Sequence, residues 1–502
     1  MLVRAFDKKH EHDGITLGLR RRQHKSTELK QTHVDCLRFT TPHCLRRLYG
    51  MNDATGTIPH PNSSLGIFTM AWQTWLGLDL DMFFTDFAPS QTGKRPFITV
   101  VNGGYRHFDL KNANNTATEI FHLEPNLDYQ YTMALADPVP VTNIQVGDEL
   151  HPSSNTNMML AALDQNYNCS GGLDGEFDSP IYNEGNNNNT TDNYCNNDNN
   201  ENTERKLKKI PRVLSISYAW NEAEFSPPYL HRQCLEFLKL GLQGITVLAS
   251  TGDYGTADQL GNCIDEATGA MVPFALGNNE TRTGAGGVRF SAVFPASCPW
   301  VTAVGGTQFA LPPSVKDRDR PGWMDRDMFP AETALDIRRK GKVNVGSGGG
   351  FSWTFTAPGY QAGVTRDYLD RVYGAAGLAE NKYFNPQNRG YPDISAMARN
   401  YVVAMHGKYH SVDGTSASAP LVASMIARIN DERLKQGKGT VGFINPVLYS
   451  RHHEMMIRDI DTGVIGGCGV ADAFPAKAGW DAATGLGSPD YEGMRRVFMS
   501  FP

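Results

Sequence analysis

Blocks of apolar residues and stretches with helical spacing predict a strand–helix–strand order in the second half of the chain. Apolar runs of strand length occupy residues 212–220 and 245–255, and the segment 230–244 between them has helical spacing and ends in glycine. Another apolar run follows at 300–306. Strands joined through a helix by short links form parallel sheets with right-handed crossovers. The pattern therefore predicts an α/β fold whose ligand site lies at the carboxyl ends of the strands.

Two other segments lack this pattern. Residues 1–33 are polar and predict a disordered arm or the remnant of a prosegment. Residues 152–208 include a tract in which eleven of the twenty residues from Asn183 to Asn202 are asparagine. A tract with so few aliphatic side chains cannot offset its ordering entropy by burial. We therefore expect residues 152–208 to form an Asn-rich, disordered insertion on the surface.

Charge and hydropathy exclude two kinds of partner. The chain has 502 residues, with 47 Lys and Arg against 53 Asp and Glu, so its formal net charge is −6. A nucleic-acid-binding protein that works by bulk basicity would show the opposite excess. No run of about 18 apolar residues is present, which a membrane-spanning helix would need. We expect neither nucleic acid nor a membrane among the partners.

Cysteines and sequons bear on the compartment. The eight cysteines occur without a Cys-x-x-Cys pair, which argues against a zinc ribbon and leaves disulfides or free thiols. Six Asn-x-Ser/Thr sequons begin at Asn62, Asn114, Asn168, Asn188, Asn189 and Asn279. Together they favour an oxidising compartment. The first residues lack the apolar segment of a signal peptide, so either the protein stays inside the cell or its true N-terminus is missing from this sequence.

Ser416 is the first candidate for chemistry. It follows Gly414 and Thr415 in a turn of small residues, and an apolar-faced helical stretch continues to residue 437, with Pro420 expected in its first turn. A serine at a helix entry lies near the positive end of the helix dipole and is open to a substrate carbonyl. Ser416 is therefore a candidate nucleophile, with an ordinary serine N-cap as the alternative.

A serine nucleophile needs a base, and two carboxylates offer one. No histidine stands in the context that a Ser-His-Asp site would require. Glu124 and Asp128 are four residues apart, so on a helix they share one face, where one of two carboxyls tends to keep its proton. Pro125 suits a first helical turn and predicts a helix that starts near Glu124. The alternative is a solvated helix face.

Asp253 is a third candidate acid. It lies in the turn of residues 250–255, directly after an apolar run. At the carboxyl end of a strand, a protonated carboxyl can donate a hydrogen bond to an oxyanion. The alternative is an aspartate that stabilises a tight turn.

Taken together, these motifs resemble the sedolisins, or serine-carboxyl peptidases, and within them the tripeptidyl-peptidase branch. The resemblance extends from residues 41–50 to the end of the chain. It is carried, in the family's order, by LEPNLD (123–128), LSISY (214–218), STGDYG (250–255), FPASCPWVTAVGGT (294–307), SGGGFS (347–352), RGYPDISA (389–396), GTSASAP (414–420) and GWDAATGLGSP (479–489). It implies a subtilisin-like parallel sheet flanked by helices, in one large catalytic domain over residues 34–502.

The resemblance also implies a role for each candidate. Ser416 matches the nucleophile, Glu124 the general base, Asp128 the acid that orients it, and Asp253 the oxyanion stabiliser. A carboxylate base and a protonated carboxyl donor coexist only at acidic pH. The implied function is acid-acting release of N-terminal tripeptides from polypeptides through an acyl-enzyme. A sedolisin-type endopeptidase and a catalytically silent secreted relative are the alternatives.

Family members carry one structural calcium ion near the C-terminus. Its ligands map onto the side chains of Asp459 and Asp481 and the backbone carbonyls of Ile460, Lys477 and Gly479. Such an all-oxygen set is what a hard cation prefers. The family usually has glycine where Lys477 stands, but a carbonyl ligand does not depend on the side chain.

The resemblance suggests disulfide pairs as well. Cys263 with Cys468 resembles a family bridge. The economical remainder is Cys234–Cys298, Cys169–Cys195 and Cys36–Cys44, although eight cysteines allow on the order of a hundred pairings.

The resemblance finally implies a location and partners. Family members are secreted precursors, whereas only about 40 residues precede the match here. We therefore expect an extracellular protein whose signal peptide and most of whose prodomain are absent from this sequence. Its expected partners are polypeptide substrates with free N-termini, and it is expected to be a monomer.

Overall fold

The computed structural model describes residues 23–24, 36–52, 56–70, 73–101, 104, 116–147, 155–164, 177, 210–273, 287–310, 329–339 and 342–502. Its centre is an eight-stranded sheet in the order β13-β12-β7-β5-β2-β4-β3, with β18 also paired to β12. The strands are β2 (Leu65–Met70), β3 (Phe97–Val101), β4 (Val141–Val146), β5 (Val213–Ile216), β7 (Thr246–Ser250), β12 (Thr302–Phe309), β13 (Glu332–Ala334) and β18 (Ile394–Met397). All the pairs are parallel except β12 with β13. The predicted α/β parallel sheet is confirmed.

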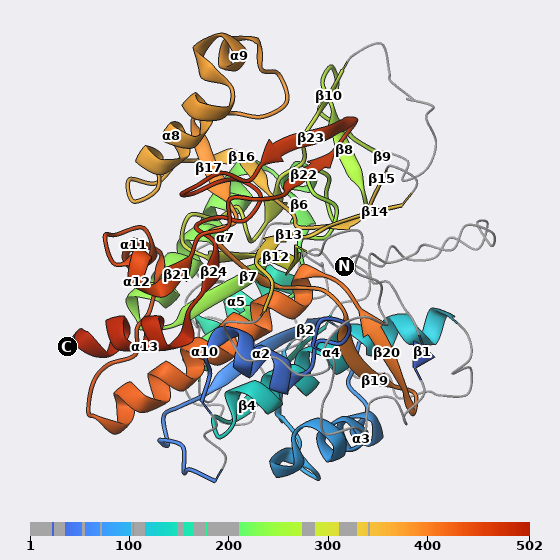
Figure 1. The fold of residues 1–502 in the computed structure, drawn as a ribbon, viewed down its shortest axis with the longest axis vertical. Coiled ribbons are helices and arrows are strands. Elements are labelled where there is room, and N and C mark those ends of the chain that lie inside the picture. The colour runs from blue at the N-terminus through green and yellow to red at the C-terminus, as the bar shows by residue number, and fades with distance from the viewer. Residues whose placement is uncertain are drawn as a thin grey trace, which may run out of the picture.

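Helices cover both faces of this sheet (Figure 1). On one face α4 (Thr116–Ala136) and α10 (Thr415–Lys435) pack against each other, and α10 also packs on β5, β7 and β12. On the other face α5 (Asn155–Leu163) packs on β3 and β4, and α7 (Pro227–Leu242) on β7. Strands covered on both faces are buried at successive positions, which is why β5 and β7 read as largely apolar runs.

Smaller elements surround this core. The further helices are α2 (Pro42–Tyr49), α3 (Gly77–Phe87), α8 (Ala362–Val372), α9 (Gly374–Glu380), α11 (Asn445–Leu448), α12 (His453–Met456) and α13 (Tyr491–Ser500), with 3₁₀ turns η1 (Pro89–Gln91) and η4 (Glu222–Glu224). The further strands are β1 (Gln23–His24), β6 (Trp220–Asn221), β8 (Asn262–Asp265), β9 (Met271–Pro273), β10 (Val288–Arg289), β11 (Val293–Phe294), β14 (Asp336–Arg339), β15 (Lys342–Gly346), β16 (Gly350–Thr356), β17 (Asn388–Tyr391), β19 (Tyr401–Met405), β20 (Lys408–Val412), β21 (Ile457–Arg458), β22 (Val464–Gly467), β23 (Val470–Pro475) and β24 (Ser488–Pro489).

The segment 152–208, expected to be a surface insertion, begins with a buried helix instead. Every residue of α5 is buried, because its apolar side chains, such as Met158, Met159 and Leu160, join the core formed with α7 and the sheet. The expectation was wrong for this part, because the short apolar stretch NMMLAAL within α5 is enough to bury a helix even though asparagine dominates the segment further along. The asparagine-rich tract itself lies outside the described residues.

The expected N-terminal arm is described at one point. Within residues 1–33 the structure describes Gln23–His24, which form β1 and pair antiparallel with β20. The rest of that arm lies outside the described residues.

Disulfide bonds tie distant parts of the chain together. The described bonds are Cys36–Cys44, Cys234–Cys298 and Cys263–Cys468. The Cys263–Cys468 pair, implied by the family resemblance, is confirmed, and so are Cys36–Cys44 and Cys234–Cys298 from the economical remainder; the remaining pair, Cys169–Cys195, lies outside the described residues. Cys263–Cys468 spans 205 residues. It joins β8 to the turn between β22 and β23, and so fixes the C-terminal hairpin to the segment that follows Asp253.

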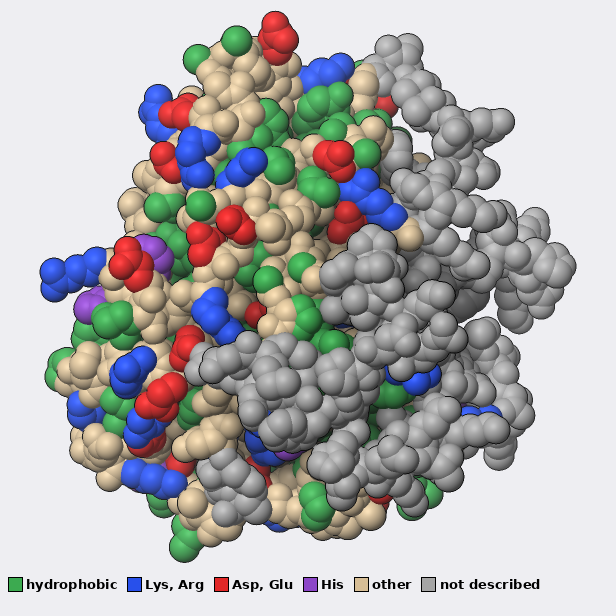
Figure 2. Space-filling view, in the orientation of Figure 1, with side chains coloured by type: hydrophobic (Ala, Val, Ile, Leu, Met, Phe, Trp, Pro, Cys, Tyr) green, Lys and Arg blue, Asp and Glu red, His purple; other side chains and the backbone are tan. Residues whose placement is uncertain are grey.

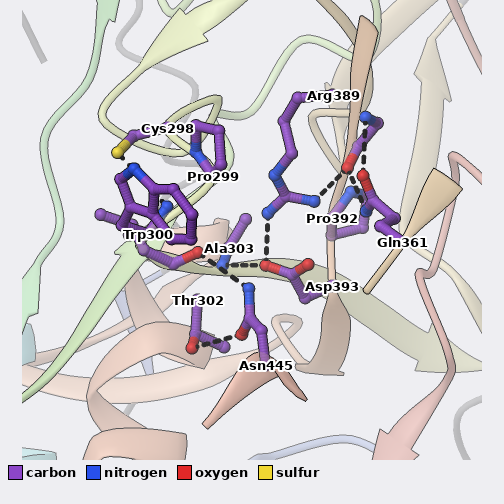
Figure 3. Close-up of polar contacts among 12 residues, drawn as sticks. Cys298, Pro299, Trp300, Thr302, Ala303, Gln361, Arg389, Pro392, Asp393 and Asn445 are labelled. Carbon is purple, nitrogen blue, oxygen red and sulfur yellow. Dashed lines mark hydrogen bonds and ion pairs between the residues drawn. The ribbon is translucent and has the colours of Figure 1, made fainter. Parts of the chain in front are cut away.

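A buried ion pair anchors the motif at residues 389–396 to the sheet (Figure 3). Arg389 Nη2 lies 2.6 Å from Asp393 Oδ2, and both side chains are fully buried. The same carboxylate oxygen accepts a hydrogen bond from the backbone amide of Ala303 in β12, at 2.7 Å, and Tyr449 donates to the other oxygen at 2.8 Å. A buried charge is tolerated only with partners of this kind. The pair thus holds the entry to β18 against β12.

The outer surface carries both signs of charge. On the face seen in Figure 2, acidic and basic side chains are interspersed, in keeping with a net charge of −6. In the part of the chain that the structure describes, no helix is both long enough and apolar enough to cross a bilayer.

Candidate active site

The four predicted catalytic side chains come from three places that lie together at the carboxyl side of the sheet. Ser416 is the second residue of α10, Glu124 and Asp128 lie one turn apart on α4, and Asp253 lies in the turn after β7. The Ser416 hydroxyl donates to the backbone carbonyl of Ser217 at 3.4 Å, and a hydrogen bond to Ser416 also favours the ionised form of Glu124. The structure thus brings the serine and the carboxylate pair together.

Pro125 lies inside α4 and not at its start, so the predicted helix boundary near Glu124 was wrong. Proline lacks the N–H that would bond the carbonyl four residues earlier, here that of Phe121. The backbone amide of Thr74 donates to this carbonyl at 2.8 Å instead. A contact from the loop after β2 therefore lets the helix continue through the proline and fixes the turn that carries Glu124.

Pro420 likewise lies in the sixth position of α10, beyond the first turn where it was expected. It leaves the carbonyl of Ser416 without its usual helical donor. The hydroxyl of Ser217, 3.4 Å away, faces this carbonyl. Both helices of the site thus contain a proline that cannot bond the carbonyl four residues earlier. In each case a donor from a loop that follows a strand of the sheet bonds that carbonyl instead.

Burial dominates the electrostatics of the carboxylate pair. Glu124 and Asp128 are each 1% exposed. Burial raises the pKa of Glu124, the charge of Asp253 adds to the rise, and the Ser416 hydrogen bond opposes it. Burial also raises the pKa of Asp128 well above its usual range, with the Glu124 charge adding to the rise and a Ser217 hydrogen bond opposing it. The pair therefore holds a proton to higher pH than ordinary carboxyls do.

Asp253 lies at the N-terminus of α10. Its Oδ1 accepts hydrogen bonds from the Thr415 amide at 2.7 Å and the Thr415 hydroxyl at 2.9 Å. Gly252, with a φ of +89°, makes the turn that aims the carboxyl this way. Burial raises the pKa of Asp253, and the two Thr415 bonds oppose the rise. The Thr415 bonds engage Oδ1 and leave Oδ2 for another partner. A protonated Asp253 can therefore donate a hydrogen bond from Oδ2.

Two neighbours of the carboxylates, Ser217 and Tyr218, were not predicted from the sequence. Ser217 Oγ lies 3.0 Å from Asp128 Oδ1. The Tyr218 hydroxyl donates to the side-chain oxygen of Gln73. Burial raises the pKa of Tyr218, and the charges of Glu124 and Asp128 add to the rise. The LSISY motif was the available signal, but a motif does not show which of its side chains face the site.

The expected calcium ligands lie close together in the C-terminal region. The Gly479 amide donates to Asp459 Oδ2 at 2.6 Å, and the Lys477 amide donates to Asp481 Oδ2 at 2.8 Å. No group of three or more His, Cys, Asp or Glu suited to a metal ion occurs among the described residues. The expected calcium site would not form such a group, because it contains only two carboxylates. Its other ligands are backbone carbonyls, including that of Ile460.

Comparisons with known proteins show the family to which the chain belongs. Residues 99–441 match the family model described as the subtilase family. The chain is 39% identical to the tripeptidyl-peptidase SED1 of Arthroderma otae, over 97% of this chain and 67% of the relative. It is 35% identical to aorsin of Aspergillus oryzae, over 96% of this chain and 68% of that protein. It is 31% identical to the tripeptidyl-peptidase sed1 of Aspergillus fumigatus, over 100% of this chain and 71% of the relative.

A solved structure supports the same fold. Pseudomonas sedolisin, a serine-carboxyl proteinase complexed with two molecules of pseudo-iodotyrostatin, matches with a TM-score of 0.56 and 19% identity, over 92% of this chain and 99% of that chain. The fold and the serine beside buried carboxyls define a serine peptidase of the subtilase class. Within that class, the chain belongs to the sedolisin family, in its tripeptidyl-peptidase branch.

Proposed function

We propose that this protein releases tripeptides from the free N-termini of polypeptides at acidic pH, through an acyl-enzyme on Ser416. One observation carries the proposal: a buried carboxylate pair faces the hydroxyl of a serine at a helix entry. The tripeptidyl-peptidases among the relatives support the choice of substrate. An endopeptidase would use the same four side chains and is the alternative.

The proposed reaction has two halves. Ser416 Oγ attacks the scissile carbonyl carbon while Glu124 takes its proton and Asp128 holds Glu124 in place. Protonated Asp253 donates a hydrogen bond to the tetrahedral oxyanion. Glu124 then gives its proton to the leaving amine, and the tripeptide remains as an ester of Ser416. A water molecule attacks this ester, Glu124 accepts a proton again, and the tripeptide leaves when the proton returns to Ser416.

The pH dependence follows from the two proton requirements. Glu124 acts as a base only without its proton, so activity is lost as pH falls and the Glu124–Asp128 pair becomes fully protonated. Asp253 donates only with its proton, so activity is lost as pH rises through its pKa, which burial has raised. We expect a bell-shaped profile of kcat/KM. The resemblance to the serine-carboxyl peptidases implies a maximum on the acid side of neutrality, whereas burial, which raises the pKa of Glu124 to about 8, moves the acid limb to higher pH. The measurement is hydrolysis of a fluorogenic tripeptide amide with a free amino group from acidic to alkaline pH.

Two further substrates separate the proposal from its alternatives. The same tripeptide with a blocked amino group should be cleaved poorly, and an internally quenched peptide with both ends blocked should resist cleavage. Rapid cleavage of the doubly blocked peptide would transfer the function to an endopeptidase. A maximum at alkaline pH would refute the carboxyl mechanism, and folded protein silent on all substrates would indicate an inactive relative.

We also propose that the C-terminal region binds one structural Ca²⁺ through Asp459, Asp481 and the carbonyls of Ile460, Lys477 and Gly479. Asp481 is fully buried, and burial raises its pKa to about 7 despite the backbone amide and Thr484 hydroxyl hydrogen bonds that oppose the rise. A buried carboxylate of this kind fits a cation, and oxygen ligands fit calcium.

Removal of calcium should destabilise the protein. We expect a chelator to lower the Tm by about 5 °C or more, and added Ca²⁺ to restore it, because the ion binds the folded chain alone. Thermal unfolding of the Asp481→Asn variant should not respond to Ca²⁺. The Asp461→Asn variant, which alters an exposed carboxylate just outside the set, should respond as the unmodified protein does. A Tm insensitive to both chelator and Ca²⁺ in the unmodified protein would contradict the site.

A further inference from the structure

Ser217 lies between the two helices of the active site. It directly follows β5, is 3% exposed, and its hydroxyl has two acceptors. One is Asp128 Oδ1 on α4 at 3.0 Å, and the other is the backbone carbonyl of Ser416 on α10 at 3.4 Å. The second acceptor is available because Pro420 cannot bond that carbonyl.

A serine hydroxyl has one proton, so its two acceptors compete. When Asp128 is ionised, a bond to the charged oxygen is the stronger choice. When Asp128 carries a proton on Oδ1, that carboxyl can donate to Ser217 Oγ, and the Ser217 proton is then free to turn toward the Ser416 carbonyl. The hydroxyl therefore changes partner with the charge of Asp128.

We propose that Ser217 is a positioning residue that couples the protonation of Asp128 to the backbone of the nucleophile Ser416. This inference rests on the proposed function and adds to it a residue outside the four catalytic groups. In the ionised state the hydroxyl stabilises the carboxylate pair, and in the protonated state it restrains the turn of α10 that carries Ser416.

The titratable groups around this hydroxyl set the expected direction. They are Glu124 and Asp128 on α4, Tyr218 after β5 and Asp253 after β7. The Ser217 hydrogen bond lowers the pKa of Asp128 against the effects of burial and of Glu124. Its loss should raise the apparent pKa at which the pair gives up its first proton. The fall in activity toward low pH, which is the acid limb of the activity profile, should then move to higher pH.

The test compares the Ser217→Ala and Ser217→Thr variants with the unmodified protein. We expect Ser217→Ala to lower kcat about 10- to 100-fold with KM little changed, and to move the acid limb up by about one pH unit. Ser217→Thr keeps the hydroxyl and should restore most of both. Ser215→Ala is the matched control, since its buried hydroxyl, two residues away in β5, has no hydrogen-bond partner in the described structure. It should leave kcat and the acid limb unchanged.

Other outcomes separate this inference from the proposed function. If the unmodified protein cleaves the tripeptide amide but Ser217→Ala keeps its kcat and acid limb, the positioning role is refuted while the function stands. If the unmodified protein is inactive, the proposed function has failed first, and this inference fails with it. If Ser217→Ala does not fold, Ser217→Cys, a similar shape with a weak donor, should show the same upward shift of the acid limb, and an unchanged limb there would refute the inference.

Discussion

Replacing Ser416 with alanine is expected to lower kcat by about 10⁴- to 10⁶-fold, because the variant has no hydroxyl to form the acyl-enzyme. Loss of one nucleophile removes the whole covalent route, so the effect exceeds that of any single hydrogen bond. The buried carboxylate pair and Asp253 remain, and KM for residual turnover should change little. The measurement is the rate on the fluorogenic tripeptide amide at the pH of maximum activity, with Tm recorded alongside.

A matched serine distinguishes chemistry from folding. Ser424 lies in the same helix, and its hydroxyl donates to the backbone carbonyl of Pro420 at 2.7 Å. Ser424→Ala should retain activity within a few-fold, because that bond stays within the helix and away from the substrate. Substantial activity in Ser416→Ala, with Ser424→Ala unaffected, would show that Ser416 is not the nucleophile.

Glu124→Gln should lower kcat by about 10⁴-fold or more. Glutamine keeps the shape of the side chain but accepts no proton at any working pH, so Ser416 loses its general base. Because substrate binding does not use the proton, KM should stay near its original value. The residual activity should also lose the acid limb of the profile, since the group that must be deprotonated is gone. Steady-state rates across pH on the same tripeptide amide measure both effects.

An exposed glutamate provides the control for this change. Glu380 ends α9 and is exposed, so Glu380→Gln alters the same functional group away from the site. It should leave kcat and the pH profile unchanged. If Glu124→Gln retained the acid limb and most of the rate, another group would be the base, and Asp128→Asn would be the next variant to measure.

In the proposed mechanism, the carboxylate pair of Glu124 and Asp128 differs from a Ser-His-Asp site in what sets its working pH. Histidine titrates near neutrality without help, whereas Glu124 and Asp128 owe their raised pKa values to burial beneath α10. In the proposed mechanism, residues that determine that burial, such as those packed between α4 and α10, therefore also determine the pH range of activity. For the same reason, replacing Ser217 is expected to move the acid limb of the pH profile. Ser217 itself makes no contact with the scissile bond in the proposed mechanism.

Local sequence was sufficient for much of this protein. The apolar runs around 212–220 and 245–255 predicted β5 and β7, because strands buried on both faces need apolar residues at nearly every position. The turn residues before Ser416 and the spacing of Glu124 and Asp128 were enough to select candidate groups, and the family resemblance ordered them. Each of these signals is carried by residues close together in the chain.

Tertiary contacts decided the rest. Pro125 alone predicts a helix start, yet α4 runs through it because the Thr74 amide, far away in sequence, replaces the missing bond. The Ser217 hydroxyl lies beside Asp128 and Ser416 for the same reason, since only the packing of α4 and α10 on β5 brings these residues together. The sequence by itself determined which groups could do the chemistry. The tertiary structure decided which backbone and side-chain groups hold them, because such bonds join residues whose separation along the chain carries no local signal.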